Sequence, residues 1–228
     1  MRSDITDKLL AENELYSSRL LKMPVCICIN GTQSMKKYEY DLDKSLKYVI
    51  KSINDGDLQK YVDIGMVSYF EGSENKIEFK NVSSLEYPRL IFSGQAPGSG
   101  EFLYLMLNEI TKKLGDYRIN GNNYCKPVIM IITSAEKEKF SEKIKRYITE
   151  KRMNNAVYII SIVISESGDT EELKSISDRV LKSTGRELID ILSAIVESME
   201  HQSRSSTSSA YEELLDPGKK ERWSRFLV

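Results

Sequence analysis

Residues 24–35 have the sequence PVCICINGTQSM, a short apolar run followed by a polar loop. A strand with one solvent face would alternate apolar and polar residues, but residues 24–29 are apolar throughout. Such a run is typical of a central strand in a parallel sheet that helices cover on both sides. Cys26 and Cys28 lie two residues apart in it, and we interpret them as small buried hydrophobic side chains. The Asn-Gly pair that follows ends the strand.

Further strands are predicted on the same grounds. Residues 127–133 (PVIMIIT) and 157–164 (VYIISIVI) are continuous apolar runs, which predicts two more central strands. Residues 61–70 (YVDIGMVSYF) and 76–82 (KIEFKNV) alternate instead, which predicts an antiparallel pair. Residues 71–75 would form the hairpin turn of that pair.

Amphipathic helices are predicted between these strands. In residues 38–53 the apolar side chains form one helical face: Leu42, Leu46, Val49, Ile50 and Ile53. The next helix carries the stripe Leu103, Leu107, Ile110 and Leu114. Later helices are predicted over residues 137–153, with Phe140, Ile144, Tyr147 and Ile148 inward, and over 171–181 and 187–200. This alternation predicts an α/β fold, a doubly wound, mostly parallel sheet with one antiparallel edge hairpin and helices on both faces.

The chain divides into three parts. Residues 1–22 are predicted to form an N-terminal helical extension, because leucines recur there among polar residues. Residues 23–202 form the α/β domain. Residues 203–228 are predicted to be a Ser-rich linker and a docking tail, which holds Phe226 and the one tryptophan of the chain, Trp223. Exposed aromatic side chains are unfavourable in water, so the tail is predicted to dock either on its own domain, the simpler explanation, or on a partner. For the second case we name these two as candidate partner-binding residues.

Composition argues against several classes of function. Lys and Arg number 33 against 34 Asp and Glu, a net charge of −1, which gives no electrostatic reason to expect nucleic acid or a membrane as partner. A Ser–His–Asp mechanism would depend on the one histidine, His201, and a His-based zinc site lacks ligands. Three cysteines make no disulfide framework. The polar start of the sequence, without an apolar core and cleavage site, predicts a cytoplasmic protein.

In an open doubly wound sheet, ligands bind at the carboxyl ends of the strands, where the strand order reverses. Three segments are predicted to meet there: residues 30–35 (NGTQSM), 97–101 (PGSGE) and 134–136 (SAE). Neither G-x-G-x-x-G after a strand nor G-x-x-x-x-G-K-[ST] is present. These loops therefore carry no standard phosphate-binding signature.

The order and spacing of these motifs resemble the von Willebrand factor A (VWA) domain, most closely the small bacterial type associated with tellurite resistance (TerY-like). The resemblance covers residues 23–203 and rests on PVCICINGTQSM, on YVDIGMVSYF with its hairpin, on GSG at residues 98–100 and on NYCKPVIMIITSAE. It implies a VWA fold in a bacterial cytoplasmic system for stress response, signalling or defence. It also implies another cytoplasmic protein as partner, in TerY-like systems often a protein kinase or a phosphatase.

Most VWA domains hold a divalent cation at the metal-ion-dependent adhesion site, and the resemblance assigns its positions in this chain. The pattern is D-x-S-x-S after the first strand, a Thr in the second loop and an Asp after the fourth strand. The residues at these positions are Asn30 for the first Asp, Thr32 for the first Ser, a retained Ser34, and Ser134 for the last Asp. In the second loop the Thr position is taken by Glu101, or by Ser99 if the loop is aligned slightly earlier. Ser99 is also a candidate partner-binding residue.

The number of negative charges at this degenerate site indicates whether it can bind a metal ion. Mg²⁺ prefers a hard octahedral oxygen shell with carboxylates in it, and here only Glu101 contributes a carboxylate. We therefore expect no bound metal at cellular concentrations and no other cofactor. Two alternatives stay open. One is a weak Mg²⁺ site of Thr32, Ser34 and Glu101 that a partner's carboxylate completes, and the other is a neutral hydrogen-bonding pocket for a peptide or an anion.

These features predict a protein that is not an enzyme and binds its partner at the carboxyl end of the sheet, around the degenerate metal site. The alternative is a nucleotide- or phosphate-binding α/β enzyme that uses the loop Gly98-Ser99-Gly100 ahead of a helix. Glycines that permit a tight turn are the simpler explanation of that loop. A third hypothesis is a switch controlled by phosphorylation of residues 203–209, for which a flexible linker is the simpler explanation.

Overall fold

The computed structural model describes residues 22–70, 77–87, 90, 92, 101–119, 126–135, 139–153, 157–165 and 168–204. These residues contain a six-stranded sheet in the order β3-β2-β1-β4-β5-β6. Its strands are β1 (Met23–Asn30), β2 (Val62–Tyr69), β3 (Lys80–Asn81), β4 (Val128–Thr133), β5 (Tyr158–Val163) and β6 (Arg179–Lys182). β3 is antiparallel to β2 and the other neighbouring strands are parallel. The predicted fold class is confirmed.

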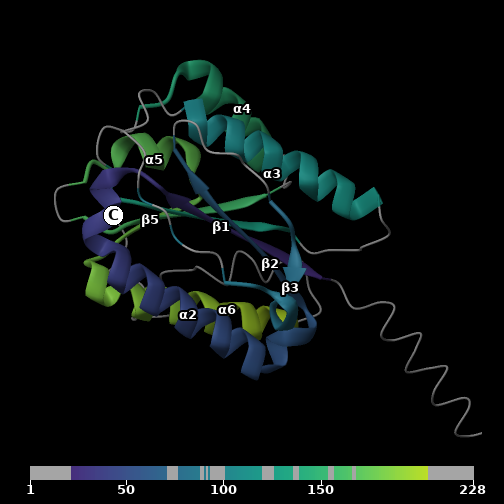
Figure 1. The fold of residues 1–228 in the computed structure, drawn as a ribbon. Helices are drawn as coiled ribbons and strands as arrows, with labels where there is room; N and C mark the ends of the chain where they lie inside the picture. The colour runs from purple at the N-terminus through teal and green to yellow at the C-terminus, as the bar shows by residue number, and fades with distance from the viewer. Residues whose placement is uncertain are drawn as a thin grey trace, which may run out of the picture.

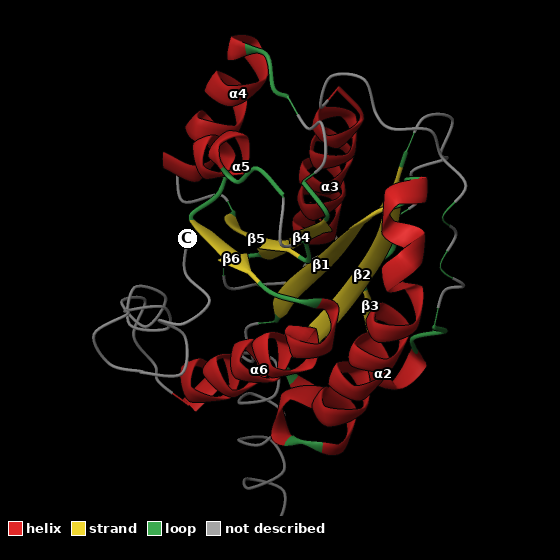
Figure 2. Ribbon diagram, turned by 90° about the vertical axis from the view of Figure 1, so that its left-hand side faces the viewer, coloured by secondary structure: helices red, strands yellow, loops and turns green. Residues whose placement is uncertain are grey.

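Helices lie on both faces of this sheet (Figures 1 and 2). One face is covered by α2 (Glu39–Asp55) and α6 (Leu188–Arg204), and the other by α3 (Glu101–Ile119), α4 (Glu142–Met153) and α5 (Glu171–Ile176). The short 3₁₀ helices are η1 (Gln33–Tyr38), η2 (Asp57–Lys60), η3 (Val82–Ser84) and η4 (Gly185–Glu187). Within the described ranges, no helix combines the length and the apolar character that crossing a membrane requires.

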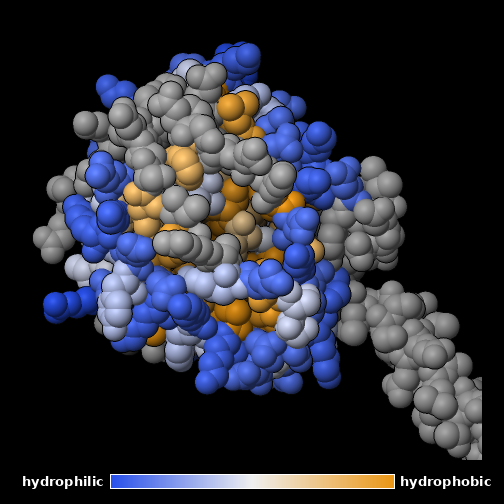
Figure 3. Space-filling view, viewed as in Figure 1, coloured by the Kyte–Doolittle hydropathy of each residue, from blue (hydrophilic) through white to orange (hydrophobic). Residues whose placement is uncertain are grey.

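The face of the described domain drawn in Figure 3 is polar over its helices. In the view of Figure 3, hydrophilic side chains cover the helices and apolar ones gather in the band between the two helical layers. The last described helix, α6, ends at Arg204. Helix α6 therefore extends two residues into the predicted linker and tail, residues 203–228, of which residues 205–228 lie outside the described residues. The same holds for residues 1–21 of the predicted N-terminal extension, residues 1–22.

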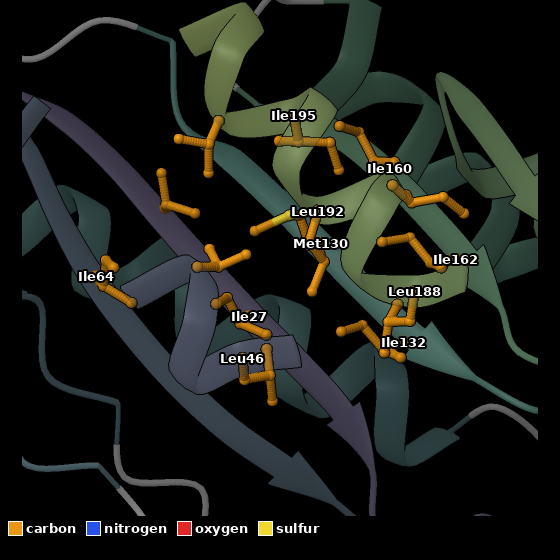
Figure 4. Close-up of a cluster of buried hydrophobic side chains, with 14 of the residues drawn as sticks. Ile27, Leu46, Ile64, Met130, Ile132, Ile160, Ile162, Leu188, Leu192 and Ile195 are labelled. Atoms are coloured by element: carbon orange, nitrogen blue, oxygen red, sulfur yellow. The ribbon is translucent and has the colours of Figure 1, made fainter. Parts of the chain in front are cut away.

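Each face of the sheet has its own apolar core. On the side of α2 and α6, Ile27 of β1 lies beside Leu46 of α2, and branched side chains of β4 and β5 pack under α6 (Figure 4). Ile27 and Leu46 are 1% and 0% exposed. The predicted inward face of α2 is confirmed: Leu42, Leu46, Val49 and Ile53 are buried, and Ile50 is partly buried against the same core.

Cys26 and Cys28 belong to the second core, under α3, α4 and α5. Their sulfur atoms lie 3.7 Å apart, and both side chains are buried. Burial, together with the hydrogen bond and charge of Cys26, raises the pKa of the Cys28 thiol well above its ordinary value. The interpretation of both residues as small buried hydrophobic side chains is confirmed, and Cys28 is a protonated thiol of low reactivity.

The predicted hairpin is shorter than expected. Its second strand was expected over residues 76–82, but β3 pairs with β2 over two residues only. The register is Asp63↔Asn81 and Ile64↔Lys80. A Cβ on Gly65 would lie 3.1 Å from the Ile77 side chain and 3.3 Å from that of Phe79. The space that Gly65 leaves is therefore filled by these two side chains, which pack on β2 without extending the ladder. The predicted turn, residues 71–75, lies outside the described residues.

The predicted helix over residues 171–181 is wrong in its second half. α5 has six residues, and the segment Arg179–Lys182 forms the edge strand β6. The carboxylate of Asp178, between the two elements, accepts hydrogen bonds from the Ile159 backbone N–H at 2.8 Å and from Arg152 Nε at 3.1 Å. Because these partners lie on β5 and at the end of α4, no local sequence pattern indicates the break.

Helix α4 begins at Glu142, later than the predicted start at residue 137. Phe140 precedes the helix, is buried, and donates its backbone N–H to a carboxylate oxygen of Glu172 at 3.1 Å. Lys145 lies 3.3 Å from the same carboxylate, and this hydrogen bond raises the pKa of Lys145. The helix start is therefore set by a contact with α5. Of the other residues predicted to point inward, Ile144 and Ile148 are buried and Tyr147 is partly buried.

Gly115 lies in the interior of α3, where it is exposed, and a Cβ built on it would meet nothing within 4 Å. Glycine weakens a helix interior because it loses more conformational entropy on folding than alanine does. We expect Gly115→Ala to raise the free energy of unfolding by about 0.5–1 kcal/mol, as measured by urea denaturation. Lys113→Ala, at an exposed position of the same helix, is the control and should have little effect. A lower stability of Gly115→Ala would contradict the open surroundings of residue 115.

Candidate functional site

The strand order reverses between β1 and β4. From β1 the chain adds β2 and then β3 on one side of the sheet, and from β4 it adds β5 and then β6 on the other side. Asn30 is the last residue of β1, and Thr133 is the last residue of β4. Their side chains meet across the two strand ends, where Asn30 Nδ2 donates a hydrogen bond to Thr133 Oγ1 at 3.1 Å. Both side chains are buried. This contact therefore joins the two strands at the position where sheets of this type bind ligands.

The same two side chains also hold the loops that follow them. The amide oxygen of Asn30 accepts a hydrogen bond from the Thr32 backbone N–H at 2.9 Å, which stabilises a turn directly after the strand. Thr133 Oγ1 accepts one from the Ala135 N–H at 3.0 Å. Asn30 thus uses an acceptor in one bond and a donor in the other, and an ionised aspartate has no such donor.

Three hydroxyl groups, which we call the hydroxyl chain, make a second link between the loops. Thr32 Oγ1 lies 2.9 Å from Ser34 Oγ, and Ser34 Oγ lies 3.0 Å from Ser134 Oγ. Thr32 and Ser134 are 2% and 0% exposed, whereas Ser34 is partly exposed. The hydroxyl chain therefore has a buried residue at each end and a partly exposed residue, Ser34, in the middle.

The loop after β4 has an unusual backbone conformation. Ala135 has a φ of 53°, in the left-handed region that residues with a Cβ seldom adopt. Gly168 lies against this loop, since a Cβ there would come within 2.5 Å of the Ser134 carbonyl oxygen and 3.3 Å of the Ala135 Cβ. Glycine permits this close approach. Strained residues persist where the surrounding structure fixes them, and Gly168 supplies part of that restraint.

The spacing of the hydroxyl chain suits a small cation, but its charge does not. Two ligands at ~2.1 Å and a right angle around Mg²⁺ lie ~3.0 Å apart, close to the distances of 2.9 and 3.0 Å in the chain. However, Asn30 and the three hydroxyl residues are neutral, and neutral oxygens do not offset the dehydration of a dication. By itself this donor set does not fit a divalent metal. Among the described residues, no group of three or more His, Cys, Asp or Glu side chains is placed to hold a metal ion.

The hydroxyl groups bond to one another rather than to a base. A serine or threonine becomes a nucleophile when a neighbouring imidazole, amine or carboxylate takes its proton. In the described part of the chain, the hydroxyls of Thr32, Ser34 and Ser134 make no hydrogen bond to such a side chain. The described residues of this arrangement can therefore donate and accept hydrogen bonds, and none of them is a base bonded to these hydroxyl groups.

The structure brings together four of the residues selected from the sequence: Asn30, Thr32, Ser34 and Ser134. Glu101 is the first residue of α3, and its side chain is not among those described. Ser99 with its glycine loop, Trp223 and Phe226 lie outside the described residues. The weak Mg²⁺ site that needs Glu101 and the phosphate-binding loop therefore stay predictions.

Sequence reasoning missed Thr133 and Gly168, and it included Ala135 in the predicted site loop of residues 134–136 without its backbone conformation. Thr133 is the polar residue that ends the apolar run of residues 127–133, and a polar residue at a strand end is a signal for a loop contact. Gly168 stands in a short polar segment between β5 and α5, where a glycine can mark a close backbone approach. No local signal indicates the positive φ of Ala135.

A doubly wound sheet with its polar side chains at the reversal of strand order defines the class of the fold as Rossmann-like α/β, and the solved structures that share it include VWA-domain proteins. No family model matches the chain, and no curated protein matches it. Solved structures do match. The chain is similar to the pilus adhesin SpaC of Lactobacillus rhamnosus GG in its open conformation, with a TM-score of 0.57 and 8% identity over 82% of this chain and 30% of that chain.

Two further solved structures share the fold. Manganese-loaded Plasmodium vivax TRAP protein has a TM-score of 0.50 and 15% identity over 75% of this chain and 72% of that chain. Proximal thread matrix protein 1 from the mussel byssus has a TM-score of 0.51 and 14% identity over 75% and 46%. SpaC and TRAP are VWA-domain proteins, and at these identities the likeness concerns the fold alone. The chain spans less than half of the mussel protein and less than a third of SpaC.

Proposed function

We propose that this chain is a VWA-type protein-binding module without catalytic activity, and that its metal-ion-dependent adhesion site is degenerate. The observation that carries the proposal is the neutral, internally bonded set of Asn30, Thr32, Ser34 and Ser134 at the reversal of strand order. The resemblance to VWA domains assigns metal ligands to these positions. A site with the hydroxyl groups and without the two aspartates keeps a polar surface for a partner and loses the charge that holds a cation.

The side chain of Asn30 supports this reading of the site. Its amide N–H donates to Thr133 while its oxygen holds the Thr32 N–H, so the residue works as a structural tie between two strand ends. An aspartate at this position would be a ligand, whereas the asparagine uses both ends of its amide within the protein. SpaC, one of the solved proteins that share the fold, is a pilus adhesin, which agrees with a binding role.

From the resemblance in sequence, we place this module in a TerY-like, bacterial cytoplasmic system for stress response, signalling or defence. Its partner is then another cytoplasmic protein, of which a protein kinase and a phosphatase are the first candidates. Neither nucleic acid nor a membrane is part of the proposal, because the net charge of the chain is −1.

The proposed interface lies at the carboxyl edge of the sheet, around η1. Lys36 is exposed in η1, two residues after Ser34, and Lys60 is exposed at the opposite edge, just before β2. A photo-crosslinking amino acid at residue 36, in cells that make this protein, is expected to give an adduct of defined mass that residue 60 does not give. With the partner identified from that adduct and purified, Lys36→Glu should raise the Kd tenfold or more, and Lys60→Glu should leave it unchanged.

Two results of this experiment would overturn the proposal. One is an adduct formed at residue 60 and not at residue 36. The other is an equal Kd for the two charge-reversal variants, because the interface would then lie away from the carboxyl edge. Lys36 and Lys60 are both charged, both exposed and both within a short 3₁₀ helix. A difference between them in adduct formation or in Kd is therefore due to the edge of the sheet at which each residue lies.

A further inference from the structure

The hydroxyl chain has more donors than it uses. Each hydroxyl group carries one hydrogen to donate and can accept two hydrogen bonds. Thr32, Ser34 and Ser134 together have three such hydrogens, but the chain contains two hydrogen bonds. Within the described part of the protein these hydroxyl groups make no further bond. Among the residues that the structure describes, one hydroxyl hydrogen is therefore left without an acceptor.

Burial decides which residue carries the remaining hydrogen. An unsatisfied donor is costly in the interior and costs nothing where water or a partner reaches it. Thr32 and Ser134 are 2% and 0% exposed, and Ser34 is the member of the chain that reaches the surface. The favoured arrangement has Thr32 and Ser134 both donating to Ser34 Oγ. The Ser34 hydroxyl hydrogen then points out of the protein.

We propose that Ser34 is the outward donor of this site and that it binds an acceptor oxygen of the partner directly, without a cation. This inference rests on the proposed function, because it names the group that the partner brings to the same edge of the sheet. Accepting two hydrogen bonds polarises the Ser34 O–H and makes it a stronger donor. Both lone pairs of Ser34 Oγ are then occupied, so Ser34 cannot be a metal ligand in this arrangement.

The melting temperatures of variants test which hydroxyl group donates in each hydrogen bond of the hydroxyl chain. Ser34→Ala removes the acceptor of two buried donors, so it should lower the melting temperature by about 5–15 °C although Ser34 is the least buried of the three. Thr32→Val and Ser134→Ala each remove one donor and should lower it by about 2–4 °C. The triple variant Thr32→Val/Ser34→Ala/Ser134→Ala leaves no unpaired donor, and it should melt above Ser34→Ala.

A one-way chain of hydrogen bonds predicts a different pattern. If Thr32 donated to Ser34 and Ser34 to Ser134, the buried Ser134 hydrogen would be unpaired, and Ser134→Ala would leave the melting temperature unchanged or raise it. The reverse direction predicts the same for Thr32→Val. Either result overturns the outward donor on Ser34. These two single variants decide the question even if Ser34→Ala does not fold.

The ligand chemistry is tested with small probes on the full chain labelled with ¹⁵N. Sodium acetate and N-methylacetamide, a carboxylate and a carbonyl, are expected to shift the amide resonances of Gly31, Ser34 and Ala135. Methylammonium chloride, which offers donors only, and sodium chloride at equal ionic strength should not shift them. The shifts should be retained in Gln33→Ala, the exposed neighbour, and lost in Ser34→Ala. The probe that acts at the lower concentration identifies a carboxylate or a carbonyl as the preferred acceptor.

Two results of the titration would overturn the inference: shifts of equal size with methylammonium, or shifts that persist in Ser34→Ala. The outcome is separate from that of the crosslinking experiment. An adduct at residue 36 without acetate or amide shifts would leave the interface standing and remove Ser34 as its donor. Resonance shifts that depend on Ser34, without an adduct at residue 36, would mean that the site binds an acceptor oxygen but that the acceptor does not come from a protein partner.

Discussion

Millimolar Mg²⁺ is expected to raise the melting temperature of the variant Asn30→Asp/Ser134→Asp by about 5–10 °C and to leave that of the unaltered protein unchanged. The two substitutions restore the carboxylates that the VWA pattern has after its first and fourth strands. They would stand beside the hydroxyl oxygens of Thr32 and Ser34, which already lie 2.9 Å apart. A ligand that binds only the folded state stabilises it by about 2.7 kcal/mol at 100 times its Kd.

The physical reason is electrostatic. Asn30 and Ser134 are 1% and 0% exposed, so two carboxylates at these positions repel each other in a poorly solvated place. The double variant should therefore be less stable than the unaltered protein in EDTA, and a dication should reverse that loss. Ser134→Asp also removes a hydrogen bond to Ser34, which frees a lone pair of Ser34 Oγ for the metal.

Thermal denaturation in Mg²⁺, Mn²⁺ and EDTA measures this effect. Asn30→Asp and Ser134→Asp alone are the matched controls and should respond less, because each adds a single carboxylate. A metal-dependent rise in the unaltered protein would show that the neutral site binds a cation, and the degenerate site would be ruled out. The lack of any rise in the double variant would mean that these positions do not face a common cation.

Replacing Ile27 by Ala is expected to lower the free energy of unfolding by about 3–4 kcal/mol. Ile27 lies on the central strand β1, paired with Met66 of β2 on one side and Met130 of β4 on the other. It is 1% exposed and packs beside Leu46 of α2 (Figure 4). The sheet on both sides and the helix above it restrict collapse around the space that the alanine leaves, so the cavity adds to the lost burial.

A smaller substitution at residue 27 and a substitution at an exposed position distinguish the loss of packing around Ile27 from a general defect in folding. Ile27→Val removes one methylene and should cost about 0.5–1.5 kcal/mol, with the same dependence of unfolding on urea concentration. Tyr40→Ala, at a position of α2 that is 77% exposed, should change stability little. A loss below about 1 kcal/mol for Ile27→Ala would contradict the close packing of β1 against α2.

The parallel sheet could be predicted because its signal is local. The runs that became β1, β4 and β5 are apolar at almost every position, and a strand buried on both faces produces that pattern by itself. The placement of the candidate site followed from topology, since the carboxyl ends of parallel strands share one edge. The residues at that edge came from the resemblance to VWA domains, and the loops that carry Asn30 and Ser134 do meet.

The parts that could not be predicted depend on distant contacts. The four residues of β6 follow a real helical segment, and the contacts of Asp178 with Ile159 and Arg152 separate the two elements. The same holds within the candidate site. Whether Asn30 presents its oxygen or its N–H to a neighbour depends on Thr133, and the role of Ser34 as an acceptor depends on Ser134. Composition and periodicity carry no information about these bonds.

The links between the two site loops span most of the domain. Ser34 and Ser134 are 100 positions apart in sequence, and Asn30 and Thr133 are 103 apart. Closing a flexible loop of that length costs ~4 kcal/mol of chain entropy, whereas each of these hydrogen bonds contributes only ~1 kcal/mol. The bonds cannot hold the loops together by themselves; the packed strands do so. A partner that binds across both loops therefore distinguishes a finished domain from a chain still in synthesis or partly unfolded, because only the finished domain has the site.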